Sequence, residues 1–334
     1  MVCFDETPVK PLVSVVIEGY NEQFNGLAPF PDTVNALLQQ DFPLNKVELL
    51  LLGSAAQVEH WKALDPGGNS FYRVRLISVD PETSHYWQLK NLGGEMSEGE
   101  IVAHIDSDAL PGSHWLSALV SGIESGADVS VGPSLYRREG CSPDSAWMLT
   151  AALPSWSLML ARTAAGQAPR AACIMAHNVA LRREVFLQHK FQTAQRSYSS
   201  ALMYFELVRS GVKIAFQPEQ KVAHGMTFRW WLGRRHFRTG WETYVARNTE
   251  KDWPRIPLLE RIKFVEPVLL RMGLVFRDAR HWFRFSRAVG VSWTRTIALF
   301  PLAVLASFAA RGAEMVGMYA ALFVPALTEH RARF

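Results

Sequence analysis

The feature that constrains the fold most is an alternation over residues 12–132, where short β-branched runs are separated by helix-like stretches. Such an alternation predicts βαβ units, and therefore an α/β fold with a mostly parallel sheet flanked by helices. Five runs are expected to be strands: Leu12–Glu18, Val47–Leu52, Val74–Val79, Ile101–Ile105 and Val129–Val131. Three stretches between them are expected to be helices: Pro31–Gln40, Tyr86–Met96 and Ser113–Glu124.

Four further elements are expected before residue 220, and they extend the same unit. They are a helix over 145–168, a strand over His177–Leu181, a helix over Ala201–Ser210 and a strand over Val212–Gln217. Gly211 stands directly after the second of these helices, at the C′ position that glycine favours.

The chain is long enough for one large α/β unit and a C-terminal region, since 334 residues exceed the usual size of a single domain. Hydrophobic residues make up 49% of the chain and charged residues 20%, which leaves ample apolar area for a packed core. We place the boundary between an α/β unit, residues 1–226, and a helical region, residues 227–334.

Charge is unevenly distributed between the two regions. Residues 1–220 contain 16 Lys and Arg against 23 Asp and Glu, whereas residues 221–334 contain 19 against 8, so the net charge changes from −7 to +11. A basic region rich in Trp and Phe can meet nucleic acid, pyrophosphate or anionic lipid head groups, and its apolar neighbours favour lipid. No nucleic-acid partner is expected, because no reading motif accompanies the basic residues.

Three cysteines without metal-ligand spacing argue against a disulfide framework and against a zinc site. The first residues are acidic where a secretory signal has basic ones, so we expect a protein that stays on the cytoplasmic side rather than one that is exported.

The C-terminal region is expected to consist of amphipathic and apolar helices. Arginines interleave with Trp and Phe over 227–248 and 257–287, a pattern typical of helices that lie on a membrane. Two apolar runs follow, Ile297–Ala310 and Met315–Leu327, and each is shorter than the roughly 20 residues that span a bilayer. Three arrangements remain open: a helical hairpin in the membrane interface, two spans, or a pair of helices buried in a soluble core or in a homodimer interface.

Two carboxylates follow the fourth expected strand, in the triplet Asp106-Ser107-Asp108. Ligands of open parallel sheets bind beyond the carboxyl ends of the strands. Two carboxylates at this spacing repel each other unless a divalent cation lies between them, and Mg²⁺ or Mn²⁺ that also takes diphosphate oxygens meets that need. The structural alternative is a surface turn, in which Asp is common.

Four blocks resemble, in order and spacing, those of the family 2 glycosyltransferases. They are SVVIEGYNE (14–22), LKNLGGEMSEGEIVAHIDSDALPGSHWL (89–116), HNVALRREVF (177–186) and GVKIAFQPEQKVAHG (211–225). The resemblance covers roughly residues 12–250. It implies a GT-A fold that binds a nucleoside diphosphate sugar with Mn²⁺ or Mg²⁺.

The resemblance also implies roles for individual residues in these blocks. Asp106 and Asp108 approach the donor ribose and the metal, Asp108 as the direct ligand, and His224 reaches the metal from the C-terminal side. The other implied donor-binding positions are Glu18, Lys90, Asn91, Asn178, Arg182, Arg235 and Arg238.

Some of these positions have a structural alternative that the sequence leaves open. His224 can be a structural histidine, and Asn91 can cap a helix end. Arg182 can belong to a solvated helix start, and Arg235 with Arg238 can belong to a basic surface that faces a membrane.

The sequence departs from the family pattern at two places. Gly53 and Ser54 stand where relatives carry the acidic residues that recognise uracil, which makes a uridine donor less secure. Ser199 and Ser200 stand where the family has the acidic pair that supplies the general base, and neither can act as a base at neutral pH.

Three explanations of the missing base remain. Glu206 or a histidine such as His85 takes the role, the acceptor is an anion that needs no deprotonation, or the chain has lost activity.

These features together predict an inverting, metal-dependent glycosyltransferase that transfers one sugar to a lipid-linked or cell-surface glycan. We expect it to act as a peripheral or monotopic protein at the cytoplasmic face of the plasma membrane, in cell-envelope polysaccharide biosynthesis. The first alternative is a non-catalytic GT-A-like protein that binds nucleotide or scaffolds a membrane glycan complex. A nucleotidyltransferase is the second, although the Gly-rich basic N-terminal loop expected of it is missing from VVIEGYNE.

Overall fold

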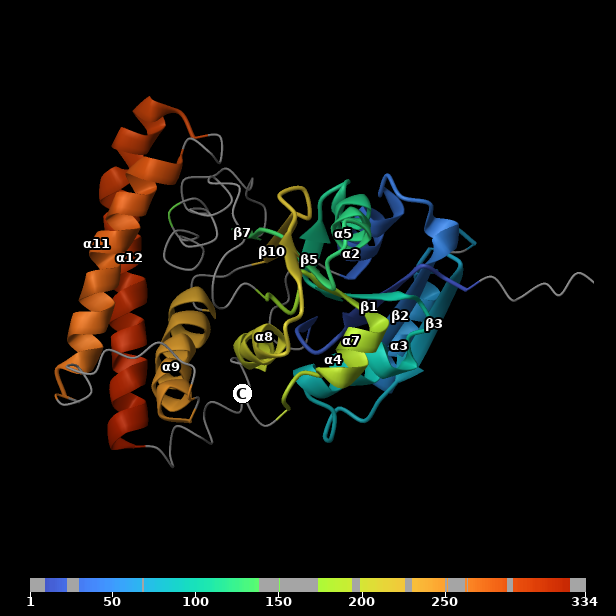
Figure 1. The fold of residues 1–334 in the computed structure, drawn as a ribbon, viewed down its shortest axis with the longest axis horizontal. Coiled ribbons are helices and arrows are strands. Elements are labelled where there is room, and N and C mark those ends of the chain that lie inside the picture. Colours follow the sequence, from blue (N-terminus) through green and yellow to red (C-terminus); the bar gives the residue numbers. More distant parts are fainter. Residues whose placement is uncertain are drawn as a thin grey trace, which may run out of the picture. The chain divides into compact units, whose positions relative to one another are not determined.

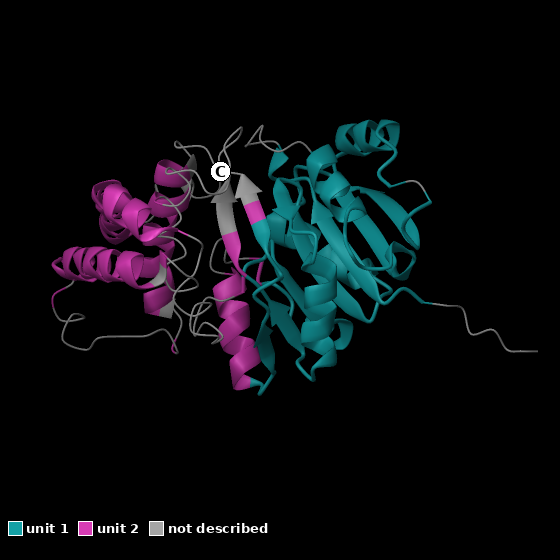
Figure 2. Cartoon of the chain, turned by 90° about the horizontal axis from the view of Figure 1, so that it is seen from above, with its two compact units in different colours: residues 1–132, 175–191, 210–222 teal, residues 133–174, 192–209, 223–334 magenta. Residues whose placement is uncertain are grey.

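The computed structural model describes residues 10–22, 30–67, 69–137, 150, 174–193, 199–225, 230–249, 251, 262, 264–286 and 291–324. The chain divides into two compact units, which are coloured separately in Figure 2. Unit 1 contains residues 1–132, 175–191 and 210–222, and unit 2 contains residues 133–174, 192–209 and 223–334. Each unit is described by itself below, and the predicted boundary at residue 226 stays a prediction.

Unit 1 is built on a seven-stranded sheet in the order β3-β2-β1-β4-β8-β6-β9 (Figure 1). Of these strands only β8 runs against the others, so the sheet is mostly parallel, as predicted. The strands are β1 (Val13–Glu18), β2 (Val47–Gly53), β3 (Arg73–Ser78), β4 (Ile101–Asp106), β6 (Val129–Val131), β8 (Val179–Arg182) and β9 (Ile214–Phe216).

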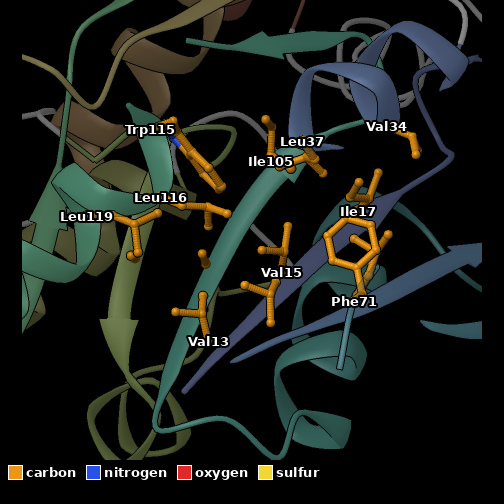
Figure 3. Close-up of a cluster of buried hydrophobic side chains, with 14 of the residues drawn as sticks. Val13, Val15, Ile17, Val34, Leu37, Phe71, Ile105, Trp115, Leu116 and Leu119 are labelled. Carbon is orange, nitrogen blue, oxygen red and sulfur yellow. The ribbon is translucent and has the colours of Figure 1, made fainter. Parts of the chain in front are cut away.

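The central strands are aliphatic at nearly every position because helices cover both faces of the sheet. Every residue of β1, β2 and β4 is buried. On one face, Val15 and Ile17 of β1 join a core with the helices α2 (Phe30–Leu38) and α5 (Trp115–Glu124). Figure 3 shows this core, with side chains from β1, α2, β4 and α5 pointing toward one another.

The other face of the sheet packs against different helices. Val16 and Leu52 contact Leu89 of α4 (Tyr86–Met96), and α7 (Arg183–Gln188) lies on the same side in Figure 1. The alternation along β1 therefore supplies both hydrophobic layers, as the period of two along a strand requires.

The predicted elements of unit 1 are confirmed to within two residues at nearly every end. The α4 helix has the expected bounds, and Gly211 has a φ of 73°, in the left-handed region expected of a C′ glycine. The expected helix over 145–168 lies outside the described residues except for residue 150. The helix α3 (Ala55–Ala63) was not predicted, although Ser54 and Gln57 form the capping box that marks its start.

The remaining short elements are the 3-10 turn η1 (Leu44–Lys46) and the strands β5 (Ala109–Pro111), β7 (Ser134–Arg137) and β10 (Val222–Gly225). None of them was predicted as such.

Outside β7 and β10, the described residues of unit 2 lie mainly in helices. Its helices are α8 (Ser199–Arg209), a π-helical segment η2 (Trp230–Phe237), α9 (Arg238–Thr249), α11 (Glu266–Phe285) and α12 (Trp293–Phe323). The α12 helix packs against η2, α9 and α11. The predicted helix over Ala201–Ser210 is confirmed. The described part of 227–248 is helical from Trp230, and the described part of 257–287 is helical from Glu266.

The predicted hairpin between the two apolar runs is wrong, because α12 is one helix of 31 residues. Arg311 and Glu314, which suggested a turn, are buried within it. Arg311 contacts Asp278 of α11 at 2.9 Å and Glu314 at 2.8 Å, so both charges are satisfied by protein partners and need no exit to water.

By length and composition alone, α12 is the one helix among the described residues that could cross a membrane. Buried core helices of soluble proteins pass the same test, so this is only a weak indication of membrane association.

Candidate functional site

The strand order of unit 1 fixes where a ligand can bind. The chain goes from β1 outward to β2 and β3 on one side and places β4 on the other side of β1, so the order reverses between β1 and β4. Ligands of open α/β sheets bind at such a switch point, beyond the carboxyl ends of the strands. Glu18 and Asp106 end these two strands and are direct partners in the register.

Four charged side chains gather at this edge. Glu18, Asp106 and Asp108 are 0%, 2% and 0% exposed, and Lys90 of α4, also fully buried, places its Nζ 2.7 Å from Asp106 Oδ1. We call these four residues the carboxylate cluster. Such burial is unusual for so many charged groups, which points to a function rather than to packing.

Asp106 is held by donors on both of its oxygens. Oδ1 forms the ion pair with Lys90 and accepts a hydrogen bond from the Tyr86 hydroxyl at 2.9 Å, and Oδ2 accepts from Asn21 Nδ2 at 2.9 Å. The carboxylate of Asp106 is therefore fixed in one orientation.

The turn after β4 sets the position of Asp108. The Thr33 hydroxyl of α2 donates to the carbonyls of Ser107 and Ala109 at 2.7 and 3.0 Å. This pair of bonds holds the backbone on both sides of Asp108.

The cluster carries an excess of negative charge. Burial raises the pKa of Glu18 well above its ordinary value, the charges of Asp106 and Asp108 raise it further, and Lys90 opposes the rise. Burial and Asp106 also raise the pKa of Tyr86, so its hydroxyl stays a donor. Three carboxylates facing one ammonium group are a site that a divalent cation would stabilise.

The residues present fit Mg²⁺ or Mn²⁺, since both metals prefer carboxylate oxygens. Asp106 is already contacted by Lys90, Tyr86 and Asn21, and Asp108, the direct ligand that the family resemblance implies, stays the predicted metal ligand. In the described part of the chain, no three His, Cys, Asp or Glu side chains are grouped to hold a metal by themselves. A cation here would therefore take further oxygens from a bound ligand.

The comparison with known families now decides the identity of the fold. The profile of Glycosyl transferase family 2 matches residues 14–189, more than half of the chain. This chain belongs to glycosyl transferase family 2. The predicted family and the predicted α/β fold are both confirmed, and the matched domain is a glycosyltransferase domain.

A curated relative supports the family assignment over a shorter stretch. The glycosyltransferase AglE of Haloferax volcanii is 32% identical over 117 residues, 35% of this chain and 37% of AglE. The match therefore spans well under half of the length of AglE.

Solved structures extend the likeness of fold to nearly the whole chain. The mannosyltransferase PcManGT of Pyrobaculum calidifontis, in complex with GDP-Man and Mn²⁺, has a TM-score of 0.60 at 17% identity. The match covers 94% of this chain and 88% of PcManGT. S. aureus TarS 1–349, in complex with UDP, has a TM-score of 0.50 at 14% identity, with 92% and 90% covered. At these identities the two matches show the GT-A glycosyltransferase fold alone.

The structure brings some of the predicted site residues to the cluster and keeps others away. Glu18, Lys90, Asp106 and Asp108 lie together, as described. His85 is exposed at the start of α4, and its ring is 6.3 Å from that of Tyr20. His85 directly precedes Tyr86, the first residue of α4 and a partner of Asp106.

Asn91 and Asn178 use their carboxamides within the protein. Asn91 Nδ2 donates to the Phe191 carbonyl at 2.8 Å, and its Oδ1 accepts from the Phe191 N–H at 3.0 Å. Asn178 is fully buried, with Trp115 Nε1 donating to its Oδ1 at 2.8 Å and its Nδ2 donating to the Gln220 carbonyl. These contacts give both residues a structural role.

Arg182 lies at the far end of the sheet from the cluster. Its strand runs antiparallel to β4 and pairs it with Ile101, the first residue of β4, whereas Asp106 is the last. The Arg182 guanidinium donates to the Ile123 carbonyl at 3.1 Å. The structure does not bring Arg182 to the cluster.

The other predicted residues belong to unit 2, so the structure does not relate them to the cluster. His224 lies in β10, and only its backbone is described. Glu206 lies in α8, Arg235 in η2 and Arg238 in α9, where its Nε donates to Glu242 at 2.9 Å. Their predicted roles stay predictions.

Two residues of the cluster's surroundings were missed from the sequence, Asn21 and Tyr86. Asn21 lies within the block SVVIEGYNE, directly after the β1 strand end, and that position was the available signal. Tyr86 had no such signal, because its contact with Asp106 joins residues 20 positions apart.

Proposed function

We propose that this chain transfers a sugar from a nucleoside diphosphate sugar to an acceptor, with inversion at the sugar carbon and with a divalent metal. The observation that carries the proposal is the carboxylate cluster at the switch point of a family-2 domain. PcManGT, which binds GDP-Man and Mn²⁺, supports a donor and a metal of this kind.

Each residue of the cluster has a distinct part in this proposal. Asp108 would hold Mn²⁺ or Mg²⁺ together with the donor diphosphate, and His224 is kept as a second proposed ligand from the sequence. A bound cation would offset the charge that develops on the leaving diphosphate. Asp106, fixed by Tyr86 and Lys90, would orient the donor ribose.

The general base of the transfer is proposed to be Glu206 or His85. Ser199, the first residue of α8, stands in place of the first acid of the family's pair, and a serine hydroxyl is not a base at neutral pH. An anionic acceptor, such as a phosphate or a carboxylate, is the alternative that needs no base.

The acceptor is proposed to be lipid-linked or a cell-surface glycan, because unit 2 offers an apolar surface. One side of α12 exposes large hydrophobic side chains and carries no charge between Arg295 and Arg311. The exposed residues of that side include Trp293, Ile297, Leu302, Leu305, Phe308 and Val316. A surface of this kind fits peripheral or monotopic attachment to the cytoplasmic face of a membrane.

The proposal is tested by nucleotide release from a panel of UDP-, GDP- and dTDP-sugars, with Mn²⁺, crude lipid acceptors and detergent-solubilised full-length protein. We expect metal-dependent turnover of one donor, and its loss in Asp108→Ala. The matched control is Glu59→Ala at an exposed position of α3, which should keep full turnover. Nucleotide binding without turnover of any donor would support the non-catalytic alternative instead.

A further inference from the structure

Each of the helices α11 and α12 exposes a stripe of large apolar side chains. On α11, Leu269 and Phe276 are two helical turns apart, and Phe276 is 78% exposed. On α12, Leu305 is 65% exposed, and Val316 and Phe323 follow it by about three and five turns, which puts all three on one side of the helix. Both helices lie outside residues 14–189, so the stripes are not part of the matched family domain.

The two stripes meet at both ends of the helix pair. The ring centroid of Phe283 at the end of α11 lies 6.2 Å from that of Trp293 at the start of α12, and that of Phe264 lies 5.8 Å from that of Phe323. All four rings are exposed, and Figure 1 shows the two helices packed along each other. The stripes therefore form one continuous apolar surface, which we call the α11–α12 face.

The opposite side of α12 is closed by protein. Glu314 is buried there, with Arg271 Nη1 of α11 at 2.9 Å and His236 Nδ1 of η2 at 2.8 Å from its carboxylate oxygens. A Cβ placed on Gly317 would overlap the Phe237 carbonyl of η2, so the two backbones are in contact. Only the α11–α12 face of α12 is therefore open to a partner.

This packing argues against α12 as a membrane span. Both η2 and α9 pack against α12, so a span would carry them into the hydrocarbon. The α9 sequence contains Arg238, Glu242 and Arg247, and charged groups in the hydrocarbon are costly. A bilayer can meet α12 only along its length, with the helix lying in the plane of the membrane.

The charges on the two helices favour an anionic partner. Arg280 and Arg284 follow Phe276 by one and two turns of α11, so both lie on its side of the helix, and both are exposed. The acids in the sequences of α11 and α12 are all buried: Glu266, Asp278 and Glu314. A second copy of this face would offer the arginines no exposed carboxylate, whereas the phosphates of anionic lipids would pair with them.

We propose that the α11–α12 face docks on an anionic lipid bilayer, with α12 in the plane of the membrane and with Arg280 and Arg284 on lipid phosphates. The inference rests on the membrane attachment in the proposed function, and it adds the docking helices, their orientation and the class of lipid. Apolar contact and charge contribute separately to such binding, so each can be removed by itself.

The experiment is co-flotation of full-length protein with vesicles of phosphatidylcholine alone, or of phosphatidylcholine and phosphatidylglycerol in equal parts. Wild type should bind the mixed vesicles more tightly, and high salt should weaken that binding. Arg280→Gln combined with Arg284→Gln should weaken binding to mixed vesicles about 10- to 30-fold, since each basic residue near an anionic surface contributes roughly fivefold. Binding to phosphatidylcholine alone should change little.

A second variant removes the apolar contribution. Phe276→Ser combined with Leu305→Ser should weaken binding to both kinds of vesicle at least about tenfold. The control is Lys62→Gln combined with Lys221→Gln, which removes the same charge from exposed positions of unit 1 and should bind as wild type does. Each variant should keep the wild-type urea midpoint, because all the altered side chains are exposed.

Three results would overturn the inference. The first is equal binding of wild type to both kinds of vesicle, and the second is resistance of the bound protein to extraction by alkaline carbonate, as expected of a span. The third is self-association without lipid that Phe276→Ser with Leu305→Ser abolishes, in a protein that binds neither vesicle, which would assign the face to a second copy. Nucleotide turnover in detergent tests the proposed transferase independently, since its loss with vesicle binding intact would remove the transferase and leave the docking surface.

Discussion

Replacement of Lys90 by methionine tests the electrostatics of the carboxylate cluster. The Lys90 side chain is 0% exposed and that of Asp106 is 3% exposed, so water cannot screen the charges that remain. Removing one partner of a buried ion pair costs about 3–5 kcal/mol, because the other partner stays buried and unpaired. We therefore expect Lys90→Met to lower the free energy of unfolding by about 3–5 kcal/mol at neutral pH.

The size of this loss should depend on pH, with a defined sign. Burial raises the folded pKa of Glu18, so the folded state binds more protons than the unfolded state between the ordinary and the folded pKa, and stability falls as pH rises through that window. Lys90 opposes the rise, and its removal raises the pKa of Glu18 further. The deficit of Lys90→Met should thus be larger at about pH 8 than at about pH 5.

Urea unfolding followed by circular dichroism at several pH values measures both effects. The control is Lys62→Met, which removes an exposed lysine paired with Glu59 and should cost less than about 1 kcal/mol. A loss below about 1 kcal/mol for Lys90→Met, or a deficit that grows as pH falls, would refute the reasoning.

Two further substitutions test single contacts. Asn91→Ala removes both hydrogen bonds to the backbone of Phe191, so it should lower the free energy of unfolding by roughly 1–3 kcal/mol. The nucleotide affinity of the folded variant, measured by titration calorimetry, should stay unchanged. A large loss of affinity at unchanged stability would instead favour donor binding by Asn91. Arg311→Met removes the buried guanidinium that Asp278 and Glu314 share. Asp278 keeps its contacts with Ser307 and Arg277, and Glu314 keeps those with Arg271 and His236, so urea unfolding should show a loss of about 1–3 kcal/mol. A neutral result would contradict the account of why α12 is continuous.

The parts of the fold that the sequence predicts are those fixed by local pattern. The strands of the parallel sheet are buried on both faces, so their aliphatic runs stand out from the helices between them. Asp106 and Asp108 were predictable as neighbours because both follow one strand end. Glu18 was predictable because parallel strands end at the same edge of the sheet.

The parts that the sequence does not predict depend on partners far along the chain. Arg311 and Glu314 suggest a break between two short helices until Asp278, 33 positions before Arg311, is known to lie beside them. Asn91 resembles a helix cap or a donor ligand until its partner Phe191, 100 positions away, is seen. No local pattern encodes such pairings.

The measurement that tests the central claim most directly is nucleoside diphosphate binding with Mn²⁺ and with EDTA, for wild type and for Asp108→Asn. If the carboxylate cluster is a metal-assisted donor site, calorimetry should show binding to wild type that weakens at least about tenfold in EDTA and by a similar factor in Asp108→Asn. Binding of equal strength in all four conditions would contradict the account, because it would show that the nucleotide site lies away from Asp108 and needs no metal.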